Sequence, residues 1–152
     1  MSTSIPEMSI VYEQVLEALG DAVVICDGDG EIRFWNAAAE RLFGFTPAEA
    51  LGSSLDLIIP KRLRELHWTG FDKAIATGQT RYAHDVLHVP ATHKDGRALS
   101  IAFTVGLLLG PERKVTGLVA VIRDDTKRFA EERDLRKRFA ELEKRYSAEA
   151  PR

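Results

Sequence analysis

The amino-acid sequence predicts an α+β domain, and three observations lead to this prediction. Two short β-like runs surround a glycine-rich turn near the N-terminus. Residues 37–78 then show helical spacing with helix-capping residues, and three longer β-like runs follow. Two strands, central helices and three further strands are typical of an antiparallel sheet that packs against helices.

The N-terminal part predicts a helix followed by a hairpin. MSIVYEQVLEALG places apolar residues at helical spacing until Gly20 ends the pattern. These apolar residues are Ile10, Val11, Val15, Leu16 and Leu19. In DAVVICDGDGEIRFWN, two strand-like runs surround the turn residues 27–30, which predicts a tight hairpin.

The middle part predicts three helices. AAAERLFGFTPAEALG holds two short ones, the second with Thr46 as N-cap and Pro47 at the first helical position. PKRLRELHWTGFDKAIATG, residues 60–78, predicts a longer helix that ends at Gly78 and is loosened at Gly70.

The C-terminal part predicts three strands and a charged helix. The strands are TRYAHDVLHVPA, ALSIAFTVGLLL and VTGLVAVIRD, joined by the turn-rich segments THKDGR and GPERK. TKRFAEERDLRKRFAELEKRY contains no Gly or Pro, and its Leu135, Phe139, Leu142 and Tyr146 follow the 4-3-4 spacing of a coiled-coil seam. The alternative is a helix that packs on the sheet or frays.

Composition excludes several classes of protein. A net charge of −2 favours neither a nucleic-acid partner nor an anionic membrane. No apolar run has the length of a transmembrane helix, and the N-terminus lacks the features of a secretory signal. The single cysteine, Cys26, excludes an intramolecular disulfide and fits a reducing compartment, so we expect a cytoplasmic protein.

The distribution of charge divides the chain. Residues 126–152 contain nine Lys and Arg against six Asp and Glu, whereas the remainder contains twelve against seventeen. We therefore expect an N-terminal cap helix at 1–20, a central domain at 21–125 and a C-terminal signalling or dimerisation helix at 126–152.

The order of these segments and several short motifs resemble the PAS sensor domain. DAVVICDGDGEIRFWNAAAERLFGF is similar to the family's opening hairpin, asparagine and following helix, and Lys94-Asp95-Gly96 matches a turn between its central strands. VTGLVAVIRDDT resembles the last strand and its Asp-Ile-Thr ending, although Asp125 replaces the usual isoleucine. The resemblance covers residues 10–127 and implies a PAS fold: a five-stranded antiparallel sheet with helices over one face, enclosing a ligand pocket.

Within this family, the haem-binding oxygen sensors of the FixL type carry their iron-ligating histidine on the long helix. His67 falls at the equivalent position, 28 residues before Asp95, and this is the interval of the FixL-type pattern without a gap. The resemblance therefore implies that His67 binds the iron of haem b through a neutral imidazole nitrogen.

The same alignment implies the remaining residues of a haem pocket. Lys73 and Arg81 fall at positions that bind the haem propionates, and both are cationic, as a carboxylate ligand requires. The distal-side positions are Tyr82, Leu87, Ile101, Phe103 and Val105. FixL-type domains have an arginine at the position of Leu87, where it donates a hydrogen bond to bound oxygen. Because leucine has no donor, we expect oxygen binding to suffer more than CO or NO binding.

The other histidines are weaker candidates for metal binding. His84 and His88 would share one strand face about 13 Å apart, too far to chelate one ion, although either is an alternative sixth haem ligand. His93 lies in the THKDG turn, where we expect it to be solvated. Trp68 is expected to be a packing residue, and Cys26 a small buried apolar residue.

Other cofactors and activities have less support. A flavin is not expected, because light-activated flavin PAS domains carry an Asn-Cys-Arg motif where this chain has SSLDLIIPKRL. The sequence shows no P-loop, zinc-hydrolase, serine-hydrolase, kinase or cyclase motif, so we expect no enzyme.

The sequence thus predicts a stand-alone PAS sensor that binds haem and senses a diatomic gas or redox state. We expect a homodimer through the N- and C-terminal helices that signals to a separate output protein, such as a histidine kinase or a regulator. The alternative is a haem-free PAS dimerisation or protein-interaction module whose pocket is empty or holds a small metabolite. A flavin-bound redox sensor is a third interpretation.

Overall fold

The computed structural model describes residues 6–150. The parts of the expected terminal segments that fall on residues 1–5 and 151–152 lie outside the described residues. The elements in chain order are α1 (Tyr12–Ala18), β1 (Ala22–Asp27), β2 (Ile32–Trp35), α2 (Ala37–Phe43), α3 (Pro47–Ala50), η1 (Leu55–Leu57), η2 (Lys61–Leu63), α4 (Arg64–Thr77), η3 (Arg81–Ala83), β3 (Leu87–Thr92), β4 (Ala98–Leu109), η4 (Pro111–Arg113), β5 (Val115–Asp124) and α5 (Thr126–Glu149).

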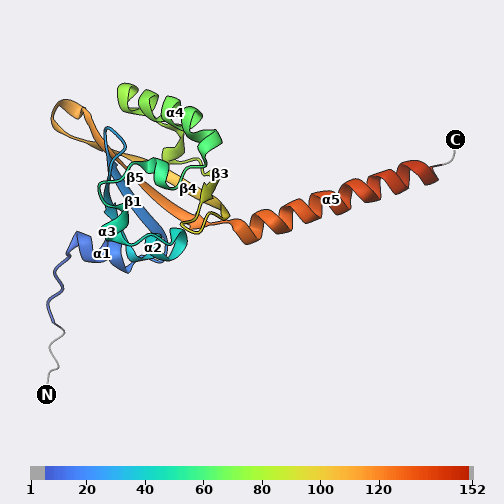
Figure 1. The fold of residues 1–152 in the computed structure, drawn as a ribbon, viewed down its shortest axis with the longest axis horizontal. Coiled ribbons are helices and arrows are strands. Elements are labelled where there is room, and N and C mark those ends of the chain that lie inside the picture. Colours follow the sequence, from blue (N-terminus) through green and yellow to red (C-terminus); the bar gives the residue numbers. More distant parts are fainter. Residues whose placement is uncertain (1–5, 151–152) are drawn as a thin grey trace, which may run out of the picture.

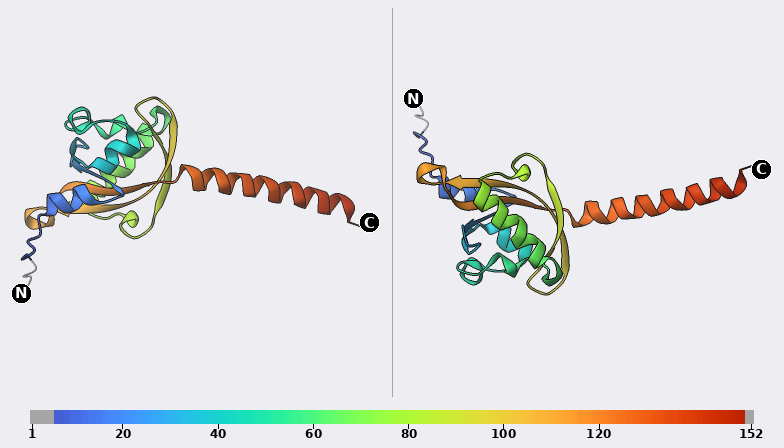
Figure 2. Two further views of the ribbon diagram at one scale, coloured as in Figure 1. Left: turned by 90° about the horizontal axis from the view of Figure 1, so that it is seen from below. Right: turned by 90° about the horizontal axis from the view of Figure 1, so that it is seen from above.

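The strands form a five-stranded sheet in the order β2-β1-β5-β4-β3, and each pair is antiparallel. β1 and β5, the first and the last strand along the chain, therefore lie side by side in the middle of the sheet. β2 and β3 form its edges. Figures 1 and 2 show α2, α3 and α4 on one side of this sheet. This arrangement confirms the predicted α+β class with a five-stranded antiparallel sheet.

The core lies between the sheet and these helices. Alternate residues of each strand face the helices, as strand geometry requires; Val24 pairs with Ala120 and Phe103 pairs with Ile122 on this face. Phe43 of α2 and Phe71 of α4 are buried against them. Burial of these large side chains is the main source of stability.

Asn36 joins three elements at one end of the sheet. Its side chain is fully buried, and Oδ1 accepts hydrogen bonds from the backbone N–H of Val23 and of Ala39, which caps α2. Its Nδ2 donates to the carbonyl oxygens of Leu16 and Asp21. All four hydrogen-bonding capacities of the amide are thus used, and α1 is tied to β1 and α2.

Several local predictions are confirmed. The Thr46 side chain accepts from the N–H of Glu49, the Glu49 side chain accepts from the N–H of Thr46, and Pro47 begins α3. Gly78 ends α4 with φ of 67°. Cys26 is buried, and burial raises the pKa of its thiol to about 11.

Three local predictions were wrong. The strand expected from residue 80 begins only at Leu87, because the side chain of Thr80 accepts from Tyr82 N–H and caps the short helix η3. α4 runs through Gly70 without a break. His93 is not solvated: its side chain is 14% exposed, and a Cβ added to Gly44 would lie 2.6 Å from its Cε1 atom.

The two terminal helices leave apolar side chains in solvent. α5 extends away from the domain as one long helix (Figure 2), so the interpretation that it packs along the sheet is wrong for the described single chain. Leu135 and Phe139 of α5 are exposed, as are Tyr12 and Val15 of α1.

Candidate functional site

The half-buried side of α4 carries a group of three aromatic rings. The ring centroids of His67 and Trp68 are 4.8 Å apart with planes at 80°, and those of His67 and Phe71 are 5.9 Å apart at 33°. Trp68 and Phe71 meet edge to face at 5.1 Å. The spacing of three or four residues along a helix places His67 and Phe71 on the same face.

Trp68 connects α4 to two other parts of the domain. Its Nε1 donates a hydrogen bond of 2.8 Å to Oδ1 of Asp56 in η1. Its six-membered ring lies directly against Gly30 in the β1–β2 turn, where a Cβ atom would overlap the ring. The prediction that Trp68 is a packing residue is confirmed, and these contacts hold the neighbouring residue of α4, His67, in place.

His67 is the residue of this group with unsatisfied hydrogen-bonding capacity. Its Nδ1 atom is buried and has no hydrogen-bond partner among residues 6–150. Burial lowers the pKa of His67, and the nearby charges of Asp56 and Asp72 oppose this shift. The ring is therefore neutral at pH 7, which is the form that binds metals.

The two cations predicted to bind propionates lie on exposed positions. Lys73 lies on the exposed side of α4, whereas His67 lies on its half-buried side. Arg81 in η3 donates from Nη2 to the hydroxyl oxygen of Tyr82 at 2.8 Å, and its guanidinium lies 5.0 Å from the centre of that ring. The structure thus brings Arg81 together with Tyr82.

The other predicted distal residues share the helix-covered face of the sheet. Leu87 on β3 pairs with Phe103 on β4, and Ile101 and Val105 follow at the alternate positions of β4. Ile101 and Val105 are buried, while Leu87 and Phe103 are half-buried. These side chains form an apolar wall without a hydrogen-bond donor.

His84 and His88 do not share a strand face, contrary to the prediction. His84 follows the short helix η3. His88 alternates with Leu87 and Val89 along β3, so it points away from the helix-covered face. This orientation excludes His88 as a sixth haem ligand in the described structure. Among residues 6–150, no three His, Cys, Asp or Glu side chains are placed to hold a metal ion directly.

His88 belongs to a polar group that the sequence reasoning missed. Its Nδ1 lies 3.1 Å from Oδ2 of Asp125 and 3.0 Å from Nη2 of Arg128. One ring nitrogen can donate to Asp125 or accept from Arg128, but it cannot do both at once. The sequence feature that could have indicated this group is Asp125, a charged residue at a position where isoleucine is usual.

The charge of Asp125 is stabilised in this group. Hydrogen bonds from Arg128, followed by that from His88, hold the pKa of the Asp125 carboxyl below its usual value, although its burial opposes this. Asp125 is 9% exposed. The group joins the edge strand β3 to the first turn of α5.

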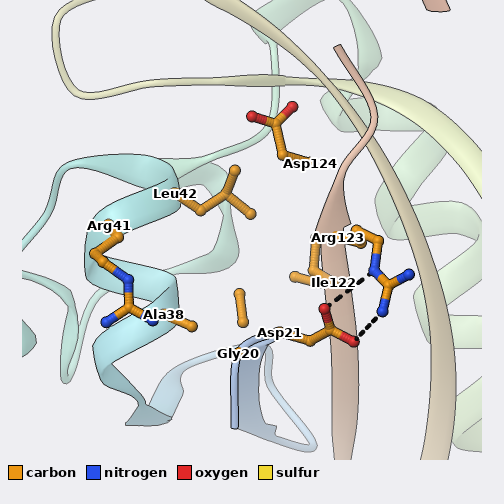
Figure 3. A pocket seen from close by; sticks show the side chains of 9 residues that line it. Gly20, Asp21, Ala38, Arg41, Leu42, Ile122, Arg123 and Asp124 are labelled. Atoms are coloured by element: carbon orange, nitrogen blue, oxygen red, sulfur yellow. Dashed lines mark hydrogen bonds and ion pairs between the residues drawn. The ribbon is translucent and has the colours of Figure 1, made fainter. Parts of the chain in front are cut away.

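A hollow of about 300 Å³ lies elsewhere, between α2 and the adjoining parts of β1 and β5 (Figure 3). At its rim Asp21 accepts two hydrogen bonds from Arg123, from Nε and Nη2, each 3.1 Å long. Arg41 and Asp124 also contribute to its lining. None of the residues predicted to bind haem lines this hollow.

In the part of the chain that the structure describes, no helix combines the length and apolar character needed to cross a bilayer.

The family model described as PAS fold matches residues 11–124. The sensor protein FixL of Bradyrhizobium diazoefficiens is 28% identical over 106 residues, which are 69% of this chain and 21% of that protein. The oxygen sensor protein DosP of Escherichia coli is 30% identical over 127 residues, 84% of this chain and 16% of that protein. The chain thus spans only about a fifth or less of these relatives.

Solved structures show the same fold. The PAS domain of a protein from Colwellia psychrerythraea superposes with a TM-score of 0.67 at 23% identity, covering 76% of this chain and 94% of that one. An RNA-binding light-oxygen-voltage receptor superposes with a TM-score of 0.71 at 20% identity, covering 91% and 41%. At these identities the likeness establishes the architecture and not the ligand.

Proposed function

Because the chain belongs to the PAS family, we propose that it is a sensor domain that binds haem b through His67 and responds to a diatomic gas or to redox state. Two of its relatives are named as sensor proteins, one of them as an oxygen sensor.

The observation that carries this proposal is the state of the His67 ring. A buried nitrogen without a hydrogen-bond partner costs free energy, which a fold retains mainly where the group has another role. Burial also keeps the ring neutral by lowering its pKa, and an uncharged imidazole is the ligand that haem iron takes. The aromatic rings of Trp68 and Phe71 provide the apolar surroundings that a porphyrin face requires.

Haem, when bound, would supply an iron that can take up a small diatomic molecule. Leu87, Ile101, Phe103 and Val105 would form the apolar wall that excludes water from that side. Because none of these four side chains donates a hydrogen bond, the wall favours CO or NO over oxygen. Lys73 and Arg81 would neutralise the two propionates; Arg81 would give up its contact with Tyr82 to do so.

The signal would leave the domain through α5. β3 carries Leu87 on the covered face and His88 on the opposite face, where it contacts Asp125 and Arg128 at the start of α5. We propose a homodimer through the exposed apolar faces of α1 and α5. Its output is relayed to a histidine kinase or regulator.

The test is an absorption titration of the protein with haem. We expect a sharp, saturable Soret band for the wild type, and its loss or displacement in His67→Ala. His88→Ala is the matched control, because it removes an exposed histidine that points away from the helix-covered face of the sheet. Weak and broad absorbance that is equal in all three proteins would refute haem ligation by His67.

A haem-free interaction module is the second candidate. It is favoured by the close aromatic contacts of Trp68 and Phe71, which occupy the space beside His67, and by the exposed apolar residues of α1 and α5. In that case the titration gives only nonspecific absorbance while the protein still self-associates. A flavin is a weaker candidate, because Cys26 is buried in β1 with a raised thiol pKa and is unsuited to a photoadduct.

A further inference from the structure

The His88 side chain lies where the edge strand β3 meets the start of α5. It alternates with the half-buried Leu87 and Val89 along β3, so it points to the face of the sheet opposite the helices. Its Nδ1 atom lies 3.1 Å from Oδ2 of Asp125 and 3.0 Å from Nη2 of Arg128. A single imidazole nitrogen is thus within hydrogen-bond distance of both an anion and a cation.

The protonation state of His88 decides which of these two contacts is a hydrogen bond. A neutral ring with its proton on Nε2 accepts at Nδ1 from the Arg128 guanidinium. Nη2 of Arg128 has a second hydrogen, which Oδ2 of Asp125 accepts at 2.9 Å. A protonated ring reverses both contacts, because Nδ1–H then donates to the carboxylate and two cations face each other at 3.0 Å.

Arg128 has another acidic neighbour on α5. Its Nη1 donates to Oε2 of Glu132, one turn further along the helix, at 3.2 Å. The guanidinium can therefore turn away from His88 towards Glu132 and still face a carboxylate. Protonation of His88 thus has a defined alternative position for Arg128.

Other charges are further from His88. Ala102 of β4, which has no charge, lies opposite His88, and Arg123 of β5 lies opposite Ala102 on the other side. Arg123 is thus one strand further away, and Asp21 accepts two hydrogen bonds of 3.1 Å from its guanidinium. Among residues 6–150, the recorded side-chain partners of the His88 ring are the carboxylate and the guanidinium named above.

Asp125 keeps its charge in the pH range where histidines take up a proton. Hydrogen bonds from Arg128, followed by that from His88, hold the pKa of the Asp125 carboxyl below its usual value. Histidine is the side chain that ordinarily changes charge between about pH 5 and 8. An imidazolium at position 88 therefore faces a carboxylate and not a neutral carboxylic acid.

We propose that His88 makes the start of α5 sensitive to pH: its protonation attracts the Asp125 carboxylate and repels the Arg128 guanidinium. Asp125 is the N-cap residue of α5, and an added cation at the N-terminus of a helix opposes the helix dipole. We therefore expect the first turn of α5 to loosen in acid. The inference goes beyond the proposed function, because its input is a proton and its three residues lie outside the predicted haem pocket.

Substitutions at position 88 separate the two states. His88→Gln has an amide oxygen that can accept from Arg128 but takes up no proton, so it represents the neutral state at every pH. His88→Lys keeps a positive charge and represents the protonated state. The His88 side chain is 50% exposed, so either replacement can reach solvent. His84→Gln removes another exposed histidine and is the matched control.

The first test measures hydrogen exchange of the Phe129 amide in the full, haem-free chain by NMR. This N–H donates to the carbonyl oxygen of Asp125 at 2.9 Å and closes the first turn of α5. From about pH 7.5 to about pH 5.5, we expect its protection factor to fall about two- to fivefold in the wild type and in His84→Gln. His88→Gln should show no such loss, and His88→Lys should show it already at the higher pH.

Protection factors are referred to the unstructured peptide at the same pH, so the intrinsic pH dependence of exchange cancels. An equal response of wild type and His88→Gln to acid would overturn the proposal. Undiminished protection of the Phe129 amide in His88→Lys at about pH 7.5 would overturn it too.

The second test asks whether the coupling between His88 and Arg128 changes sign. A double-mutant cycle of His88→Ala and Arg128→Ala, measured by urea unfolding, isolates the pairwise energy. At about pH 7.5 the hydrogen bond should make the coupling favourable, and at about pH 5.5 charge repulsion should make it unfavourable. A coupling of the same sign at both pH values would contradict the proposal.

The failure of this inference and that of haem binding are separable, because both tests use the haem-free chain. A wild type that shows the pH response but no Soret band refutes only the haem proposal. A Soret band that depends on His67, together with a Phe129 amide that responds equally in wild type and His88→Gln, refutes only the role of His88.

Discussion

Arg128 binds Asp125 at the start of α5 through two hydrogen bonds, from Nε to Oδ1 at 2.6 Å and from Nη2 to Oδ2 at 2.9 Å. His88 on β3 approaches both side chains through its Nδ1 atom. The contact therefore joins the sheet's edge strand to the helix that leaves the domain. This contact exists because the chain has Asp125 at a position where the PAS pattern has isoleucine.

Asp125→Asn is expected to destabilise the protein at neutral pH by about 1 kcal/mol, because it removes charge-assisted hydrogen bonds at a partly solvated site. The lowered pKa of Asp125 means that its stabilisation is present above the carboxyl's unfolded pKa and is lost as pH falls through the folded value. Urea unfolding at about pH 7, 5 and 3.5 should show the difference from wild type shrinking towards acid. Asp134→Asn, at an exposed position of α5, is the control, and an equal effect of this variant would contradict the prediction.

His67→Leu is expected to stabilise the haem-free protein at neutral pH by about 1 kcal/mol, because it removes a buried nitrogen that lacks a partner. Since burial lowers the pKa of His67, the unfolded chain takes up a proton first as pH falls below about 6.5. The wild type should therefore lose more stability between pH 7 and 5 than the variant does. Thermal unfolding across this range measures it, with His84→Leu as the control; parallel pH profiles for wild type and His67→Leu would count against the prediction.

Gly30→Ala is expected to cost about 2–3 kcal/mol. Gly30 has φ of 82°, which alanine adopts poorly, and the added Cβ would overlap the ring of Trp68. Gly28→Ala is the matched control in the same turn, because a Cβ there meets nothing within 4 Å. Denaturant unfolding and tryptophan fluorescence should both respond to Gly30→Ala. Similar costs for the two variants would show that the contact with Trp68 is not the cause.

Asn36→Ala is expected to cost about 3 kcal/mol, since it leaves buried backbone groups of three elements without partners. Asn36→Asp distinguishes the contact that caps α2 from the contact that holds α1. The aspartate oxygen can still accept from Ala39 and cap α2, but it has no donor for the carbonyl of Leu16. Hydrogen exchange should therefore show α1 released in both variants and α2 frayed only in Asn36→Ala. Retained protection of α1 in Asn36→Asp would contradict this account.

The sequence alone determined the order of the elements and the local signals within them. Thr46 and Pro47 predicted the start of α3 because a helix cap depends on residues only a few positions apart. The seam from Leu135 to Tyr146 was visible for the same reason, since helical periodicity is a local property. His67 was singled out by a resemblance of pattern, and its role as a haem ligand stays a prediction.

Only the tertiary structure decided which distant residues meet. Trp68 packs on Gly30, His93 packs on Gly44, and Arg123 binds Asp21, in each case across dozens of residues of chain. Periodicity places a side chain on a face of its own element but does not say which element lies opposite. The group of His88, Asp125 and Arg128 was missed for this reason. Its members come together because β4 pairs with both β3 and β5, with Ala102 of β4 opposite His88 on one side and opposite Arg123 on the other, so that His88 and the start of α5 are only one strand apart.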